Sequence, residues 1–214
     1  MVLDRDQATP NGELRRLVIL SSDLRDFTRM SNTLTPQQVV QTLNIYFGDM
    51  IEVLNSHSIH VDKFMGDGIL AFVDPNSGDE ATCAELGARA ALEMQERLNL
   101  TNDKLRVLGL PNLRLGVALH AGEVVLGSIG AKSKLQYTII GDSVNLASRL
   151  ESFCKILGVG IVISAAFRDL LTMETQNLFR ELGWHEVRGI SGPVRLYGTG
   201  AKPADVPVPA DRAA

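Results

Sequence analysis

A tight hairpin in the first third of the chain constrains the fold most. Two short apolar segments, residues 59–64 and 68–73, are separated by Met65, Gly66 and Asp67. Because glycine permits a positive φ, this spacing predicts two antiparallel strands joined by a tight turn. The fold must therefore contain a β-sheet that holds Asp67 at the tip of a hairpin.

The segments before the hairpin predict a strand and a helix. Residues 15–23 form a short apolar run with β-branched members, which favours a buried strand that ends at Asp23. Residues 34–56 begin as a helix should, with Thr35 as N-cap, Pro36 at the first position and Gln38 completing a capping box. The apolar residues of this helix recur at helical spacing and predict one buried face, formed by Val39, Val40, Leu43, Phe47, Met50, Ile51 and Leu54.

The rest of the chain alternates helical and extended patterns. These predict a helix over 78–98, strands over 113–122 and 135–140, a helix from Gly141 and Asp142 to a stop at Gly158, a strand over 159–164, a short helix over 166–171 and a hairpin over 179–200. The order predicts an α/β fold, an α+β sandwich of a mixed sheet and flanking helices with a βαββαβ core.

One glycine-rich segment invites comparison with a phosphate-binding loop. Gly122 and Gly127 have the spacing of such a loop, but Ser128 follows where a P-loop requires lysine. A P-loop is therefore rejected, and close packing against the glycines is predicted instead.

Asp23 and Asp67 are the candidate catalytic carboxylates. Each lies where a strand presents a short acid at its tip, and such a pair suits Mg²⁺ beside a nucleotide triphosphate. Each aspartate alone also has a simpler interpretation. A Gly-Asp-Gly turn often serves only to close a hairpin, and an aspartate after a strand is often only a cap. Downstream, Asn145 and Arg149 fall on one side of a helix at i,i+4 spacing.

Composition limits the partners of the chain. With 214 residues, 45% apolar and 21% charged, it is long enough for one soluble domain, and its net charge of −4 does not favour a nucleic-acid partner. Cys83 and Cys154 are widely separated and lie in helical patterns, so we expect reduced core thiols and a cytoplasmic setting. No stretch predicts a membrane-spanning helix. Residues 1–13 and 201–214 are expected to be flexible ends around one domain at 14–200.

Several spaced motifs in one order give the chain a family resemblance. FTR after SSDLRD, then KFMGDG, HAGEVVLG and YTIIGDSVNLASRLE, resemble the class III nucleotidyl cyclase catalytic domain from Leu14 to Gly200. The resemblance implies a ferredoxin-like core and conversion of ATP to 3′,5′-cyclic AMP and pyrophosphate. It also implies a homodimer in which each of two sites takes its metal-binding aspartates from one protomer and its other residues from the partner.

The resemblance also assigns roles to single residues. Asp23, Asp67 and the backbone carbonyl of Leu24 would bind two Mg²⁺, for which Mn²⁺ can substitute. The remaining roles are Asn145 on the ribose, Arg149 on the transition state, and Phe27, Thr28 and Arg188 on the phosphates. The simpler reading for Arg149 is an ion pair with Glu151 or Asp142.

Lys63 and Thr138 are the candidates for reading the base. Adenine offers N1 as an acceptor and N6 as a donor, which fits a lysine cation and a hydroxyl acceptor. Guanine carries hydrogen on N1 and opposes Lys63, so ATP is favoured over GTP. Thr138 also resembles the subgroup that includes bicarbonate-responsive cyclases. By this analogy, the expected regulator is a further regulatory domain or a small activator such as bicarbonate.

Some residues depart from the family pattern. Asp26 stands where the family usually has glycine, beside the expected phosphates, and Ser58 and Ile59 replace a usual glycine pair. The added carboxylate is expected to weaken nucleotide binding or recruit a metal. The four histidines, His57, His60, His120 and His185, have no metal-ligand spacing. The competing hypotheses are a nucleotide-binding regulatory module without activity, a guanylyl cyclase, and a polymerase-like transferase.

Overall fold

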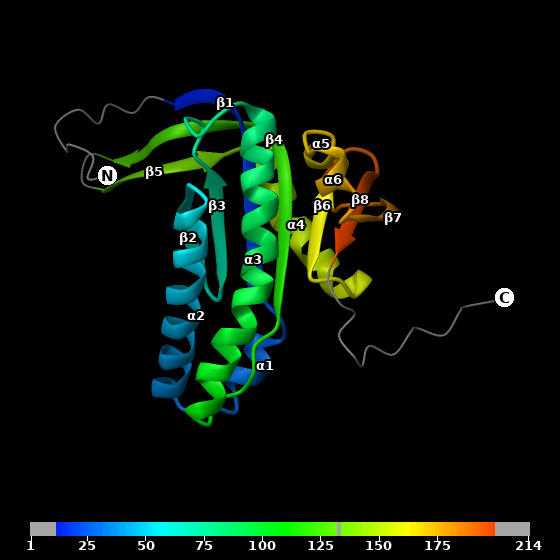
Figure 1. Cartoon of the computed structure of the whole chain (residues 1–214). Coiled ribbons are helices and arrows are strands. Elements are labelled where there is room, and N and C mark those ends of the chain that lie inside the picture. Colours follow the sequence, from blue (N-terminus) through cyan, green and yellow to red (C-terminus); the bar gives the residue numbers. More distant parts are fainter. Residues whose placement is uncertain (1–11, 132–133, 200–214) are drawn as a thin grey trace.

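The fold is built on one mixed β-sheet. The computed structural model describes residues 12–131 and 134–199, and within them eight strands form a sheet in the order β2-β3-β1-β4-β6-β8-β7, with β5 paired to β4 (Figure 1). Only β4 and β6 pair in parallel among these strands. The strands are β1 Gly12–Leu24, β2 Ile59–Met65, β3 Gly68–Val73, β4 Leu115–Ala131, β5 Lys134–Ile140, β6 Ile161–Ser164, β7 Arg180–His185 and β8 Val194–Thr199.

Helices cover both faces of this sheet. They are α1 Phe27–Ser31, α2 Pro36–Ser56, α3 Glu80–Val107, α4 Asp142–Leu157, α5 Ala165–Arg168 and α6 Met173–Gln176. Successive residues of β1 point to opposite faces of the sheet. Val18 and Leu20 pack in the core under α2 and α3. Leu17 and Ile19 pack on the other face with residues of α4. α2 and α3 thus lie side by side on one face and α4 on the other (Figure 1).

The predicted βαββαβ core is confirmed. β1, α2, β2, β3, α3 and β4 follow one another in the chain, and their strands lie in the order β2-β3-β1-β4, the ferredoxin-like arrangement. The glycine-rich segment continues β4 to Ala131, so it is a strand and no P-loop, as expected. α3 ends at Val107 rather than at Leu98, and the short helix α6 was not predicted.

The predicted capping box of α2 is present, but the predicted buried face is partly wrong. Thr35 Oγ1 accepts a hydrogen bond from the Gln38 backbone N–H at 3.3 Å, and Gln38 Oε1 accepts one from the Thr35 N–H at 2.9 Å. Val40 is 57% exposed, while Tyr46 and Val53 are fully buried. At 100° per residue, Val40 lies roughly 130° around the helix from the centre of the buried side, and no part of the sheet reaches it.

The hairpin forms as predicted, with a shorter turn. Met65 pairs with Gly68, so Met65 belongs to β2 and the turn consists of Gly66, at φ +68°, and Asp67. β1 begins at Gly12, two residues before the expected domain start. The expectations for residues 1–11 and 201–214 lie outside the described residues.

Both cysteines lie in the core, as expected. Cys83 and Cys154 are free and buried, and burial raises the pKa of the Cys154 thiol to about 12. Among the helices of residues 12–131 and 134–199, none has the length and apolarity required to cross a membrane.

Candidate active site

Asp23 and Asp67 meet at one edge of the sheet, as the sequence predicted. β1 and β3 are antiparallel neighbours with Ser22 opposite Ile69, which brings the end of β1 beside the hairpin turn. A Cβ at Gly68 would lie 2.7 Å from the Ser22 carbonyl oxygen and 3.2 Å from Asp23 Oδ1. Glycine at position 68 therefore lets the turn approach the Asp23 carboxylate.

The two carboxylates interact strongly. Burial, and then the negative charge of Asp67, raise the pKa of Asp23 to about 6, while the nearby Arg25 lowers it in part. Two hard oxygen ligands whose charges repel one another are what a divalent cation neutralises, so the residues present fit Mg²⁺. Within the described part of the chain, no group of three or more histidine, cysteine or acidic side chains could hold a metal. Backbone and phosphate oxygens would therefore complete the coordination.

A buried ion pair lies behind these carboxylates. Arg25 Nη2 is 2.8 Å from Glu151 Oε1, and both side chains are about 90% buried. Burial raises the pKa of Glu151 to about 7 even though Arg25 opposes the shift. The pair occupies the space beside Gly116, where a Cβ would overlap the Arg25 guanidinium. Glu151 is therefore engaged by Arg25 and is not the partner of Arg149 that the simpler sequence reading proposed.

The Asp26 carboxylate is paired with two cations. It adopts the left-handed conformation at φ +57°, which explains why glycine suits this position, and its carboxylate pairs with Arg114 and Lys155 at 2.6 Å each. The hydrogen bond from Lys155, the largest cause, holds the pKa of Asp26 below its usual value. Two cations thus neutralise the additional carboxylate. Phe27, the next residue, is buried in the core, so only its backbone is available to a phosphate.

Lys63 and Thr138 come together as the resemblance implied. Lys63 Nζ donates a hydrogen bond to Thr138 Oγ1 at 3.0 Å, joining β2 to β5. A third residue, Asp62, completes the group: its carboxylate lies 3.1 Å from Lys63 Nζ and accepts a hydrogen bond from Thr138 Oγ1 at 3.0 Å. Sequence reasoning missed Asp62, because neighbours in a regular strand point to opposite faces.

Asn145 and Arg149 occupy the exposed side of α4. Val144 and Ala147 bury the opposite side against β1 and β3. A Cβ at Gly189 would lie 2.9 Å from Arg149 Nη1, so the Arg149 guanidinium lies against the loop that carries the exposed Arg188. The Arg149 side chain therefore lies next to the chain segment that carries Arg188.

The two halves of the predicted site are not joined by polar contacts within the described part of one chain. Among the described residues, no hydrogen bond or ion pair joins Asp23 or Asp67 to Lys63, Thr138 or Arg149. The four histidines also lie apart, with His57 bound to Glu93 and His120 to Ser164.

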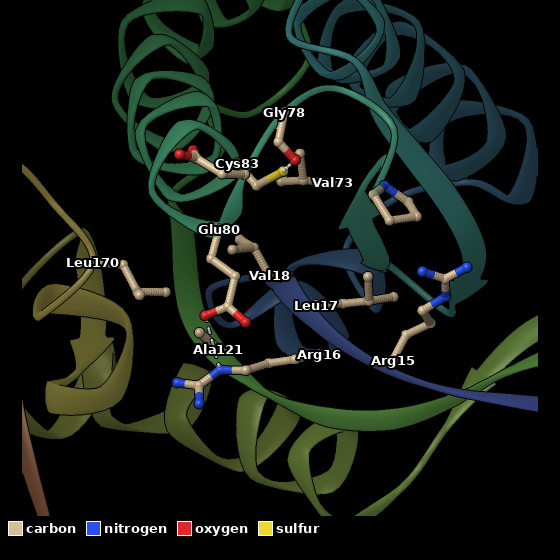
Figure 2. Close-up of a pocket in the computed structure, with 12 residues that line it drawn as sticks. Arg15, Arg16, Leu17, Val18, Val73, Gly78, Glu80, Cys83, Ala121 and Leu170 are labelled. Atoms are coloured by element: carbon tan, nitrogen blue, oxygen red, sulfur yellow. Dashed lines mark hydrogen bonds and ion pairs between the residues drawn. The ribbon is translucent and has the colours of Figure 1, made fainter.

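A cavity of about 420 Å³ lies toward the opposite end of β1 from Asp23. Figure 2 shows Arg16 and Glu80 pointing toward one another in it, joined by an ion pair of 3.2 Å, with the Cys83 thiol near Gly78. None of the candidate site residues lines this cavity. It is therefore separate from the carboxylate pair.

Comparisons with known proteins point to one family. The family model for the adenylate and guanylate cyclase catalytic domain matches residues 11–199. "Adenylate cyclase 1" of Rhizobium meliloti (strain 1021) is 36% identical over 183 residues, which cover 86% of this chain and 27% of that protein. "Adenylate cyclase" of Anabaena cylindrica is 36% identical over 169 residues, covering 77% and 32%. The chain thus spans about a quarter to a third of the length of these relatives.

Two solved structures extend the comparison. The adenylyl cyclase CyaB from P. aeruginosa superposes with a TM-score of 0.80 at 28% identity, covering 92% of this chain and all of that one. The guanylyl cyclase Cya2 superposes with a TM-score of 0.75 at 34% identity, covering 91% and 98%.

Proposed function

The chain belongs to the adenylate and guanylate cyclase catalytic domain family, and we propose that it converts ATP to 3′,5′-cyclic AMP and pyrophosphate at sites shared by two copies of the chain. The observation that carries the proposal is the Asp23–Asp67 pair, two mutually repelling carboxylates at the tip of adjacent strands. Mg²⁺ held there would lower the pKa of the ribose 3′-hydroxyl and offset charge on the polyphosphate.

The residues of the chain then position the substrate. The ribose 3′-oxygen attacks the α-phosphorus in line, pyrophosphate leaves from the opposite side, and the hydroxyl proton passes to solvent. Arg149 suits the charge that develops on the α-phosphate, because its guanidinium is planar and permanently charged. Asn145, one helical turn before it, would orient the ribose. Thr28, Arg188 and the backbone at Phe27 would contact the phosphates, and the backbone carbonyl of Leu24 would join Asp23 and Asp67 in holding the metal.

A dimer explains why the two halves of the site lie apart in one chain. The carboxylates of one copy would face Lys63, Thr138, Asn145 and Arg149 of the other, which makes two equivalent sites under two-fold symmetry. Exposed apolar side chains near these residues support the proposal that a second copy covers this surface. Four of them are each between 42% and 49% exposed: Phe64, Met65, Tyr137 and Ile140.

Lys63 and Thr138 favour adenine over guanine. A lysine donor matches N1 of adenine, whereas guanine N1 carries hydrogen. The similarity to the guanylyl cyclase Cya2 keeps cyclic GMP as the second candidate product.

The test is to incubate the full chain with ATP or GTP and with Mg²⁺ or Mn²⁺, and to identify the product by mass. We expect cyclic AMP and pyrophosphate from ATP. Asp23→Asn and Asp67→Asn should each lower turnover at least about a hundredfold, because one carboxylate leaves the metal charge unmatched. Asp169→Asn, at an exposed aspartate after α5, is the control and should keep wild-type turnover. Cyclic GMP as the main product would establish the second candidate, and no cyclic product would reject both.

A further inference from the structure

The side chain of Asp62 is fully buried beneath the two candidate base-reading residues. The pairing of β2 with β3 shifts register between Val61 and Lys63, which leaves Asp62 as an additional residue at a β-bulge. The bulge lets Asp62 and Lys63, although neighbours, both reach Thr138 on β5. The Asp62 carboxylate also accepts, at Oδ1, a hydrogen bond of 3.2 Å from the Ile139 backbone N–H.

The distances favour one placement of the hydroxyl hydrogen: Thr138 Oγ1 lies 3.0 Å from Asp62 Oδ2 and 3.5 Å from the Ile139 carbonyl oxygen, so the carboxylate is the better acceptor. A carboxylate only accepts and an ammonium only donates, whereas a hydroxyl has one hydrogen and two lone pairs. Lys63 Nζ donates to Thr138 Oγ1, so the one hydroxyl hydrogen of Thr138 is free to point at Asp62 Oδ2, 3.0 Å away. Toward a ligand, Thr138 has one lone pair left and no hydrogen. Lys63 donates one hydrogen to Thr138 and forms an ion pair of 3.1 Å with Asp62, which leaves hydrogens of its ammonium group for a ligand.

We propose that Asp62 determines the base preference of the site by holding the Thr138 hydroxyl as an acceptor. This inference rests on the proposed function, because it concerns the residues assigned to the base. With Asp62 in place, Lys63 presents a donor to N1 of adenine and Thr138 presents an acceptor to its 6-amino group. The 6-oxygen of guanine would face the Thr138 lone pair instead, and two acceptors repel one another. Asp62 is thus a positioning residue that acts through Thr138.

The substitution Asp62→Asn should change the Thr138 hydroxyl from an acceptor to a donor toward the ligand. The asparagine oxygen is held by the Ile139 N–H, as Oδ1 of Asp62 is now. The amide nitrogen then replaces Oδ2 and donates to Thr138 Oγ1, so the hydroxyl hydrogen turns away from position 62. An acceptor on the ligand can then receive it in preference to the distant Ile139 carbonyl oxygen at 3.5 Å. We expect the preference for ATP over GTP, measured as the ratio of kcat/KM values, to fall by about tenfold.

Three further variants separate this role from a structural one. Asp74→Asn removes another carboxylate near β2 that bonds His60 rather than Lys63 or Thr138, and it should keep the wild-type preference. Thr138→Ser keeps the hydroxyl and should also keep the wild-type preference for ATP. Thr138→Val removes the hydroxyl, so adding Asp62→Asn to Thr138→Val should change the preference no further. An additional tenfold loss in that double variant, or a wild-type preference in folded Asp62→Asn, would overturn the proposal.

A binding measurement on the unaltered chain covers the case in which Asp62→Asn does not fold. The probes are 3′-deoxyribonucleoside triphosphates, which cannot cyclise, with a purine that carries an amino group, hydrogen or a methoxy group at position 6. All three keep N1 as an acceptor. We expect the affinity to fall in that order, because the methoxy oxygen faces a lone pair of Thr138.

The outcomes of the binding series are distinct. Equal or tighter binding of the methoxy compound than of the unsubstituted purine would show that Thr138 donates, and would overturn the inference while leaving the cyclase proposal intact. Failure of all three probes to bind would overturn the proposed function and this inference together.

Discussion

At the scale of single residues, His120 shows how burial sets the response of the domain to acid. It lies in β4, 7% exposed, with Nδ1 2.8 Å from Ser164 Oγ. Burial, and secondly the charge of Arg16, lower the pKa of His120 from 6.5 to about 4. The folded chain therefore holds this imidazole neutral at pH values where the unfolded chain protonates it.

The sign of the resulting pH dependence follows from linkage. Between pH 6.5 and about 4 the unfolded state binds a proton at His120 that the folded state does not, so the free energy of unfolding decreases as the pH falls. The loss should reach about 3 kcal/mol at pH 4. His120→Gln removes this titrating group, so the variant should not suffer this loss. Between pH 7 and pH 4, the free energy of unfolding of the unaltered chain should therefore fall by about 3 kcal/mol more than that of His120→Gln. Urea unfolding across this range measures it. A difference that stays constant with pH would contradict the burial of a neutral His120.

At the scale of elements, Gly116 is the residue of β4 that lies beside the end of β1 and beside α4. It pairs with Asp23 across the sheet, and a Cβ there would overlap both the Arg25 guanidinium and the Glu151 carboxylate. Gly116→Ala must therefore separate the buried Arg25–Glu151 pair, which should lower the free energy of unfolding by about 3–5 kcal/mol. Equilibrium unfolding in urea is the measurement.

Gly48 provides the matched control for this substitution. It lies within α2, and no atom comes within 4 Å of the position that an alanine methyl group would occupy there. Because glycine is a poor helix former, Gly48→Ala should raise the free energy of unfolding by about 0.5–1 kcal/mol. Equal effects of the two alanines would show that the space beside Arg25 and Glu151 is not needed.

The elements also show what a sequence pattern can and cannot predict. The capping box at Thr35 and the hairpin at Gly66 are local, and both form as expected. The closeness of Asp23 and Asp67 follows from their places at strand ends once those strands pair. Contacts that depend on irregular or distant geometry were missed. Asp62 reaches Thr138 only through a bulge, and Arg25 meets Glu151 126 residues later in the chain.

At the scale of the whole molecule, the proposed division of the site between two copies makes activity depend on a pair of chains. Asp23→Asn and Arg149→Ala should each be nearly inactive as homodimers, since both sites of each dimer lack one essential group. In a mixed dimer, one site collects both changes while the other combines the intact Asp23 of one copy with the intact Arg149 of its partner. Random exchange of equal amounts makes about half of the dimers mixed, each with one working site, so activity should recover to about a quarter of the unaltered value.

A second mixture shows whether this recovery comes from the proposed division of the site. Asp23→Asn and Asp67→Asn change the same half-site, so every site in their mixed dimer takes its carboxylates from one altered copy and keeps a defective pair. Mixing these two variants should therefore restore no activity. Both mixtures are measured after subunit exchange has been demonstrated with differently tagged copies. Recovery in the carboxylate mixture would mean that Asp23 and Asp67 serve one site from different chains, and no recovery with Arg149→Ala would mean that Asp23 and Arg149 act within one chain. Either result would contradict the proposed shared-site dimer. In that dimer, Asp23 and Asp67 of one copy serve the same site, and the partner's α4 supplies Arg149 to it.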